Sequence, residues 1–431
     1  MRSARAARAT EAVYGKGPSA KKVAVPADEL RRFLDRALAW TDHSLRLNRR
    51  KDGLYHSYNL ISFAGKNRLT VRHLYEMLEG QVAILSSGLL SPQESLALFR
   101  ALRGSRMYRR DQHSYMLYPN RSLPRFLERN GIPAADARRS RLIARLLADD
   151  NRDLVEQDHL GQVRFRPGIL NGRALGDALD RLAADKTYAP LVRSERARME
   201  GIYEELFDHQ SFTGRSGTFY GYEGLGSIYW HMVSKLLLAA QEIYFRAERE
   251  NAPASLRRGL AAAYYDIRRG LGDAKEPGQY GAFPMDPYSH TPANAGAKQP
   301  GLTGQVKEDI LCRQGELGVF VENGQIVLRP SLLRRAEFRP TPGQFTFHDV
   351  RGKEQTIRLP ADSLAFTFCQ TPFVYRLGGR EGVEITLADG SKSEVSALQI
   401  DLKTSRAILG RTGAVAKVKV NLDPAKLLGT I

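Results

Sequence analysis

The chain has 431 residues, of which 42% are hydrophobic and 26% charged, a composition typical of a folded protein with two or three domains. No stretch approaches the roughly 18 uncharged apolar residues of a membrane-spanning helix, so we expect no membrane partner. The two cysteines, Cys312 and Cys369, form neither a CxxC motif nor a Cys/His cluster. A disulfide framework and a structural zinc site are therefore not expected, and we predict no metal ion.

The net charge of +18 would suit a nucleic-acid partner, but the basic excess is spread along the chain. Residues 326–431 carry a net +6 and the remainder +12, and neither part contains a basic stripe. Only residues 1–25 concentrate charge, with six Lys or Arg side chains against Glu11. We interpret them as a flexible basic tail, although their composition also resembles a transit peptide. No secretory hydrophobic region follows, so we expect a cytoplasmic location, and nucleic-acid binding is the least favoured function.

Residues 26–323 have helical periodicity, with Gly- and Pro-marked loops between the predicted helices. The first helix begins after Pro26, and the second is capped by Thr70 and ends near Gly88. Ser91-Pro92-Gln93-Glu94 predicts a third, because the serine can cap it, the proline suits its first position and the glutamate can bond back to the cap. Further helices are predicted over residues 121–130, 133–149, 173–184, 191–206, 224–248, 253–271 and 303–319. With hardly any strand pattern between them, these helices predict an all-helical domain.

Beyond Asn323-Gly324 the hydrophobic period changes to two, which is typical of strands. Apolar residues alternate in the runs 364–368, 383–387 and 418–422. Between the last two runs, Ala388-Asp389-Gly390-Ser391 supplies the Asp-Gly pair of a hairpin turn. Several short, regularly spaced strands predict a small β-sandwich over residues 324–431. The predicted fold class is therefore mainly α with a C-terminal β-domain.

Polar and aromatic side chains gather in four loops of the predicted helical domain. Sugars favour this mixture, because their C–H faces stack on aromatic rings while their hydroxyl groups need polar partners. One such cluster alone could equally be structural, since Tyr and His often occupy half-buried positions. Four clusters in loops of one domain favour a binding site. The predicted sugar contacts in these loops are His56, Tyr58, Asn59, His113, Arg215, Tyr222 and His290.

Glu223 and Asp111 are the candidate catalytic carboxylates. Glu223 directly precedes a predicted helix, on which Trp230 lies close to the same face and could stack on a sugar. It could act as a general acid or contact a sugar, or it could be a first-turn glutamate favoured by the helix dipole. Asp111 stands between Arg110 and His113, so it is either an acid–base group or half of a surface ion pair.

Residues 301–309 predict a loop that runs into a helix. The backbone N–H groups there, together with Thr303 and Lys307, could hold an anion such as phosphate. The alternative is an ordinary threonine N-cap, and the spacing is not that of a nucleotide-binding P-loop. The predicted ligands for phosphate or for sugar hydroxyl groups are Arg215, His231, Gln305 and Lys307.

The stretch from Arg215 to His231, with Tyr222-Glu223-Gly224-Leu225-Gly226 at its centre, resembles the (α/α)6-barrel carbohydrate-active enzymes. The most similar group is that of the inverting glycoside phosphorylases of the cellobiose and β-1,2-oligoglucan type, with their hydrolase relatives. The order of a helical toroid and a β-domain is similar to the carboxy-terminal part of these enzymes, and the resemblance covers residues 40–330. It implies a toroid with the site at its mouth, one carboxylic acid as proton donor, and inorganic phosphate as the nucleophile in place of water.

The resemblance predicts an enzyme that hydrolyses or phosphorolyses β-linked gluco-oligosaccharides with inversion. An oligosaccharide is then the partner, phosphate the one expected co-substrate, and no cofactor is required; a homodimer is left open. One alternative is a non-catalytic carbohydrate-binding or scaffold protein on the same fold. Another is the C-terminal part of a larger enzyme, because fewer helices are predicted than a closed (α/α)6 toroid contains.

Overall fold

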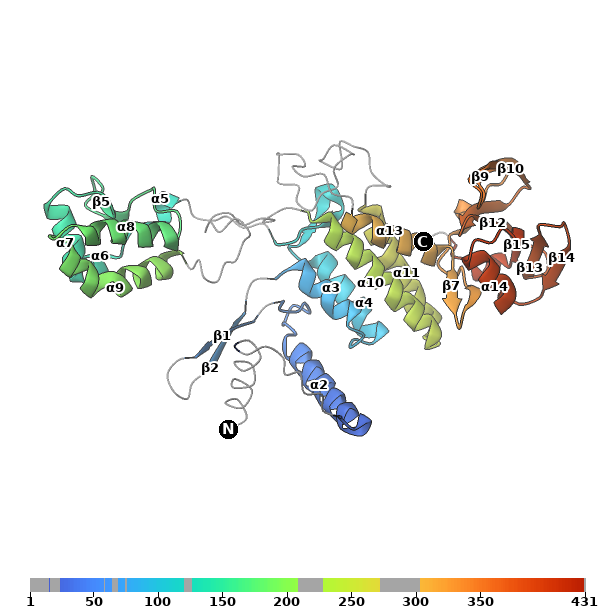
Figure 1. The fold of residues 1–431 in the computed structure, drawn as a ribbon, viewed down its shortest axis with the longest axis horizontal. Coiled ribbons are helices and arrows are strands. Elements are labelled where there is room, and N and C mark those ends of the chain that lie inside the picture. The colour runs from blue at the N-terminus through green and yellow to red at the C-terminus, as the bar shows by residue number, and fades with distance from the viewer. Residues whose placement is uncertain are drawn as a thin grey trace. The chain divides into compact units, whose positions relative to one another are not determined.

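The structure is a computed structural model. It describes residue 15 and residues 24–57, 59–63, 69–73, 76–119, 126–207, 228–271 and 303–429 (Figure 1). Helices form about 47% and strands about 23% of the described part, so the fold class is mixed α/β. The chain divides into two compact units, residues 1–51 and residues 52–431. No helix among the described residues combines the length and apolar character needed to cross a membrane.

In the first unit, helix α2 (Ala27–Leu47) follows Pro26 as predicted, with Asp28 and Glu29 in its first turn. Its apolar residues recur at the three- and four-residue spacing of a one-sided stripe, and none of them is buried.

Five helices of the second unit pack together, and we call them the helical body. They are α3 (Leu78–Ser86), α4 (Pro92–Gly104), α10 (Trp230–Arg249), α11 (Ala254–Arg269) and α13 (Thr303–Glu316). Helix α10 contacts the other four (Figure 1). Its side chains are buried on all but one side. Gly315 of α13 lies against Gln241 of α10, whose side-chain amide donates to the Cys312 carbonyl at 2.7 Å. The absence of a side chain at Gly315 allows this close approach.

The predicted capping box of α4 is confirmed. The Glu94 amide donates to Ser91 Oγ at 3.2 Å, and the Ser91 amide donates to the Glu94 carboxylate at 2.8 Å. The predicted cap at Thr70 is wrong, because Thr70 lies in a strand and the next helix begins at Leu78. The β-branched residues of that strand pair with a partner ten residues earlier in the chain, which helical periodicity does not reveal.

Three short antiparallel hairpins lie in the segment that was predicted to contain only helices and loops. Their strands are β1 (Asn59–Phe63) with β2 (Leu69–His73), β3 (Tyr108–Arg109) with β4 (Ser114–Tyr115), and β5 (Val155–Gln157) with β6 (Val163–Phe165).

Residues 126–207 have a hydrophobic core of their own. Its helices are α5 (Phe126–Arg129), α6 (Ala134–Arg139), α7 (Arg141–Ala148), α8 (Gly172–Ala184) and α9 (Ala189–Phe207). The helix predicted over residues 133–149 is divided at Ser140, whose Oγ accepts from the Ile143 amide. Ser140 Oγ also donates to the buried Glu195 carboxylate, which accepts from the Arg141 amide at 2.9 Å. A carboxylate at this position satisfies the free N–H groups of a helix start.

The C-terminal part, residues 319–429, is built on one five-stranded sheet. Its strands are β11 (Ser363–Phe368), β12 (Thr371–Leu377), β13 (Gly382–Leu387), β14 (Lys392–Val395) and β15 (Val415–Leu422), in the order β11-β12-β15-β13-β14. The three predicted strand runs and the Asp389-Gly390 hairpin are confirmed. Strands β12 and β15 are parallel, and the connection between them contains α14 (Leu402–Leu409), a helix that was not predicted.

Hairpin β7 (Val319–Glu322) and β8 (Gln325–Leu328) turns at Asn323-Gly324, where both residues have positive φ. This hairpin and α14 share one apolar core with the five-stranded sheet. A second hairpin joins β9 (Gly343–His348) to β10 (Glu354–Leu359). The described residues 319–429 therefore form one mixed sheet with two hairpins and a helix.

Candidate functional site

Four chain segments, three of which carry predicted site residues, meet at one end of the helical body. The Leu78 amide at the start of α3 donates to the Leu117 carbonyl at 2.9 Å, and Met116 pairs with Ile228 just before α10. At the end of α11, a Cβ on Gly270 would lie 2.2 Å from the His113 carbonyl oxygen, so a glycine is required there. We call this end the polar end and define it by residues 107–117, 228–235, 266–270 and 303–309.

The polar end contains a buried carboxylate with an unused oxygen. Only 2% of the Glu308 side chain is exposed, and its Oε1 lies 3.6 Å from His231 Nε2 and 3.5 Å from Lys307 Nζ. Glu308 Oε2 and His231 Nε2 have no hydrogen-bond partner among the described residues. Because buried polar atoms are almost always paired, two unpaired buried atoms at the polar end mark a candidate ligand site.

Burial lowers the pKa of His231, and the positive charge of Lys235 one turn later lowers it further. The Glu308 carboxylate acts in the opposite direction but does not outweigh them. His231 is therefore neutral near pH 7, with one ring nitrogen as donor and the other as acceptor. Lys307 beside the Glu308 carboxylate and Lys235 near His231 outnumber that one carboxylate, so this part of the polar end has a local positive charge.

Glu316, eight residues after Glu308 on α13, is equally buried but fully paired. Its carboxylate accepts from Tyr264 Oη at 2.7 Å, from Arg268 Nε at 2.9 Å and from Arg313 at 2.7 Å. The two glutamates therefore differ in kind. Glu316 holds α11 and α13 together, whereas Glu308 has one carboxylate oxygen without a hydrogen bond from a described residue.

His113 lies in a network that joins three elements of the polar end. Its Nδ1 lies 3.0 Å from Tyr108 Oη and its Nε2 lies 3.0 Å from Asp266 Oδ1, and the residue has the left-handed φ of 44°. Arg103 donates to Asp266 Oδ2 at 2.9 Å and stacks over the Tyr108 ring. Burial raises the pKa of Tyr108, although Arg103 opposes this shift. Both ring nitrogens of His113 are engaged, so in this arrangement the residue fixes the segment around it.

Asp111 lies in a short 3-10 turn (Arg110–Gln112), with 62% of its side chain exposed. Its carboxylate accepts three hydrogen bonds from Arg109, at 2.9, 3.0 and 3.1 Å, and these bonds lower its pKa. Of the two interpretations left open by the sequence, this geometry corresponds to the surface ion pair. A general acid needs a raised pKa, whereas the hydrogen bonds from Arg109 lower that of Asp111.

The His56 ring stacks on the His73 ring, with centroids 3.9 Å apart, and His73 Nδ1 lies 2.7 Å from Asn59 Oδ1. This cluster adjoins α3, because the Tyr55 amide donates to the buried Gln81 side chain at 2.9 Å. Trp230 is 1% exposed, so its indole ring packs within the helical body and does not face solvent.

The structure thus brings six predicted residues to the polar end: Asp111, His113, Trp230, His231, Lys307 and Gln305, the last of these in the first turn of α13. The predicted site residues that lie outside the described residues are Tyr58, Arg215, Tyr222, Glu223 and His290.

Sequence reasoning missed Glu308, Asp266 and Tyr108. For Glu308 the sequence pattern points the wrong way, since the apolar residues of α13 lie on its exposed face. Val306 and Ile310 are 42% and 60% exposed, whereas Glu308 and Glu316 are buried. Charged residues at the core-facing positions of a helix indicate a site or a buried ion pair. For Asp266 no sequence signal exists, because its partner His113 lies 153 residues away.

The family model described as GH149 phosphorylase insertion domain 2 matches residues 123–210. The match supports a relationship to the glycoside phosphorylases. The matched segment corresponds to the separate core of residues 126–207, and it contains none of the polar end. No curated protein matches the chain. Among the described residues, no three His, Cys, Asp or Glu side chains are grouped as metal ligands.

Proposed function

We propose that the chain is a glycoside phosphorylase, or part of one, that cleaves β-linked gluco-oligosaccharides with inversion. The observation that carries the proposal is the match of residues 123–210 to an insertion domain of a phosphorylase. We further propose that the helical body belongs to an (α/α)6 toroid whose mouth is the polar end. His231 and Lys307 lie beside Glu308, and the charge of Lys235 acts on His231, which supports this assignment because a phosphorylase needs a positively charged pocket for phosphate.

In the proposed reaction, a carboxylic acid donates its proton to the glycosidic oxygen as the C–O bond breaks. A phosphate oxygen attacks the anomeric carbon from the opposite face, so the products are a sugar 1-phosphate of inverted configuration and a shortened saccharide that keeps the proton. Glu223 is the proposed proton donor. Asp111 suits this role less, because the hydrogen bonds from Arg109 lower its pKa and favour the ionised form, which has no proton to donate.

Lys307 and Lys235 supply positive charge for the phosphate, and the neutral His231 can donate a hydrogen bond to it. Glu308 is a positioning residue in this proposal, because its carboxylate lies between His231 and Lys307. Arg215, Gln305 and His290 are proposed as further phosphate or hydroxyl ligands. Tyr58 and Tyr222 are proposed as stacking platforms, and His56 and Asn59 as sugar contacts beside α3.

The test is incubation of the protein with a panel of β-linked gluco-oligosaccharides, with and without phosphate, followed by assay of sugar 1-phosphate. We expect sugar 1-phosphate only with phosphate present, and a loss of at least about tenfold in kcat/KM for Lys307→Gln. Lys403→Gln, which changes an exposed lysine on α14, is the control and should keep full activity. Saccharide binding without release of any sugar would instead favour the second candidate, a non-catalytic carbohydrate-binding protein. Release of free sugar at the same rate without phosphate would show a hydrolase and refute phosphorolysis.

A further inference from the structure

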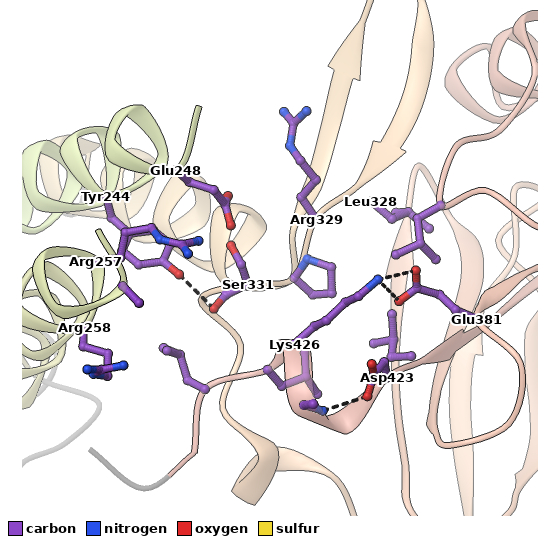
Figure 2. A pocket seen from close by; sticks show the side chains of 17 residues that line it. Tyr244, Glu248, Arg257, Arg258, Leu328, Arg329, Ser331, Glu381, Asp423 and Lys426 are labelled. Atoms are coloured by element: carbon purple, nitrogen blue, oxygen red, sulfur yellow. Dashed lines mark hydrogen bonds and ion pairs between the residues drawn. The ribbon is translucent and has the colours of Figure 1, made fainter. Parts of the chain in front are cut away.

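A cavity of about 470 Å3 separates the α10–α11 hairpin from the C-terminal sheet, and it shares no residue with the polar end (Figure 2). Tyr244, Arg257 and Arg258 line it from the helices, and Ser331 and Lys426 line it from the opposite side. Tyr244 Oη donates to the Ser331 carbonyl at 3.1 Å, which fixes the two walls relative to each other. The volume lies within the usual range for small-molecule sites.

Arg257 is a half-buried guanidinium group with no hydrogen bond or ion pair to any described residue. Its Nε is fully buried and unpaired, and so is Ser331 Oγ on the facing wall. Arg258, exposed beside it, also forms no ion pair within the described part of the chain. A partly buried cation without a partner lowers the stability of the fold. Two unpaired donors in one cavity, Arg257 Nε and Ser331 Oγ, therefore indicate a ligand that accepts hydrogen bonds.

Three carboxylates also line the cavity, and two of them are already bonded. Glu381 accepts from Lys426 Nζ at 2.7 and 2.9 Å, and Asp423 accepts from the Ala425 amide at 2.9 Å (Figure 2). Glu248 forms no ion pair with a described residue, so it can accept a hydrogen bond from a hydroxyl group. The free groups are therefore cationic donors and one carboxylate acceptor.

We propose that this cavity is a second ligand site that binds a phosphate group, supplied by inorganic phosphate or by a sugar phosphate. Arg257 and Ser331 Oγ donate to the phosphate oxygens, since a guanidinium matches the geometry of phosphate. A sugar attached to the phosphate would place hydroxyl groups within reach of Glu248. The inference does not rest on the proposed function, because binding here involves no catalytic group.

Calorimetric titration of the intact chain tests the proposal, with potassium phosphate, glucose 1-phosphate and glucose as ligands and potassium chloride as the ionic-strength control. We expect Arg257→Gln to weaken phosphate binding at this site by about tenfold or more, as expected for loss of a charge-assisted hydrogen bond. The matched control is Arg335→Gln, which removes an exposed arginine that lines a different cavity and should leave binding unchanged. Lys307→Gln should remove only binding at the polar end, so the two sites are distinguished.

If glucose 1-phosphate binds more tightly than phosphate and Glu248→Gln removes the difference, the ligand is a sugar phosphate. If glucose 1-phosphate and phosphate bind with equal affinity, the ligand of this cavity is inorganic phosphate. Phosphate binding that is absent in the wild type, or identical in the wild type and Arg257→Gln, would overturn the proposal. Far-UV circular dichroism and the milder Arg257→Lys variant, which keeps the charge, separate a binding defect from misfolding.

Discussion

Replacing Glu316 by alanine should destabilise the helical body strongly. The carboxylate is 1% exposed and accepts from Tyr264, Arg268 and Arg313, so its removal leaves a buried phenol and a largely buried guanidinium group without their main acceptor. Breaking a buried ion pair in this way costs about 3–5 kcal/mol. Arg313 is 35% exposed and also bonds Glu337 at 2.7 Å, so its share of the loss is small. We therefore expect about 3 kcal/mol, the lower end of that range.

The assay is urea unfolding followed by tryptophan fluorescence. The sequence has two tryptophans, Trp230, which is buried in the helical body, and Trp40, which is 66% exposed on α2. In a Trp40→Phe background the fluorescence therefore reports on the helical body alone. This matters because the chain has several cores and need not unfold in a single transition. With a urea dependence of about 1–3 kcal/mol per molar, the midpoint should fall by about 1 M or more.

Glu250→Ala is the matched control, since it breaks an exposed pair with Arg246 at the end of α10. This substitution should lower the free energy of unfolding by only about 0.3–0.5 kcal/mol. Equal shifts of the midpoint for Glu316→Ala and Glu250→Ala would refute the view that the Glu316 network holds α11 and α13 together.

Three further predictions concern the capping box, the imidazole of the polar end and the separate core. Ser91→Ala should lower stability by about 1 kcal/mol in thermal unfolding, because it removes the N-cap of α4; a change below about 0.3 kcal/mol would contradict this. The folded pKa of His231 lies below its ordinary value of 6.5, so the unfolded chain binds this proton first and stability falls as the pH drops below about 6.5. In urea unfolding at pH 5–7, the stability of His231→Asn should depend less on pH than that of the wild type. An equal pH dependence in both proteins would contradict this prediction. Residues 123–210, expressed alone, should give a cooperative thermal transition by circular dichroism, because their core needs no other part of the chain; a non-cooperative melt would show that the core is incomplete.

Local signals in the sequence were reliable where local physics decides the structure. The capping box at Ser91 and the strand runs around Asp389-Gly390 were found, since each depends on residues close together in the chain. The strand at Thr70 was missed, because its pairing with the strand that begins at Asn59 outweighs its helical spacing. The parallel pairing of β12 with β15 joins strands about 45 residues apart, a kind of contact that periodicity cannot reveal.

In the candidate site, too, some residues were found from local sequence signals and others were missed. Lys307 and His231 were selected from polar residues in loops and at helix starts, where binding groups concentrate. Glu308 was overlooked because it was read as one charge of a solvated helix, although its neighbours Val306 and Ile310 are the exposed ones. The apolar residues of α13 do not mark its buried side, so the position of Glu308 relative to them could not reveal its burial.

The inverted face of α13 also bears on how the polar end works. A helix that buries two glutamates and exposes Val306 and Ile310 gains less from apolar burial than its length permits. Glu316 offsets that cost through three bonds to α11 and α13, but Glu308 does not, since one of its oxygens is unpaired. A carboxylate held in this way is stabilised when a ligand donates a hydrogen bond to it. Ligand binding at the polar end should therefore strengthen the packing of α13 on α10.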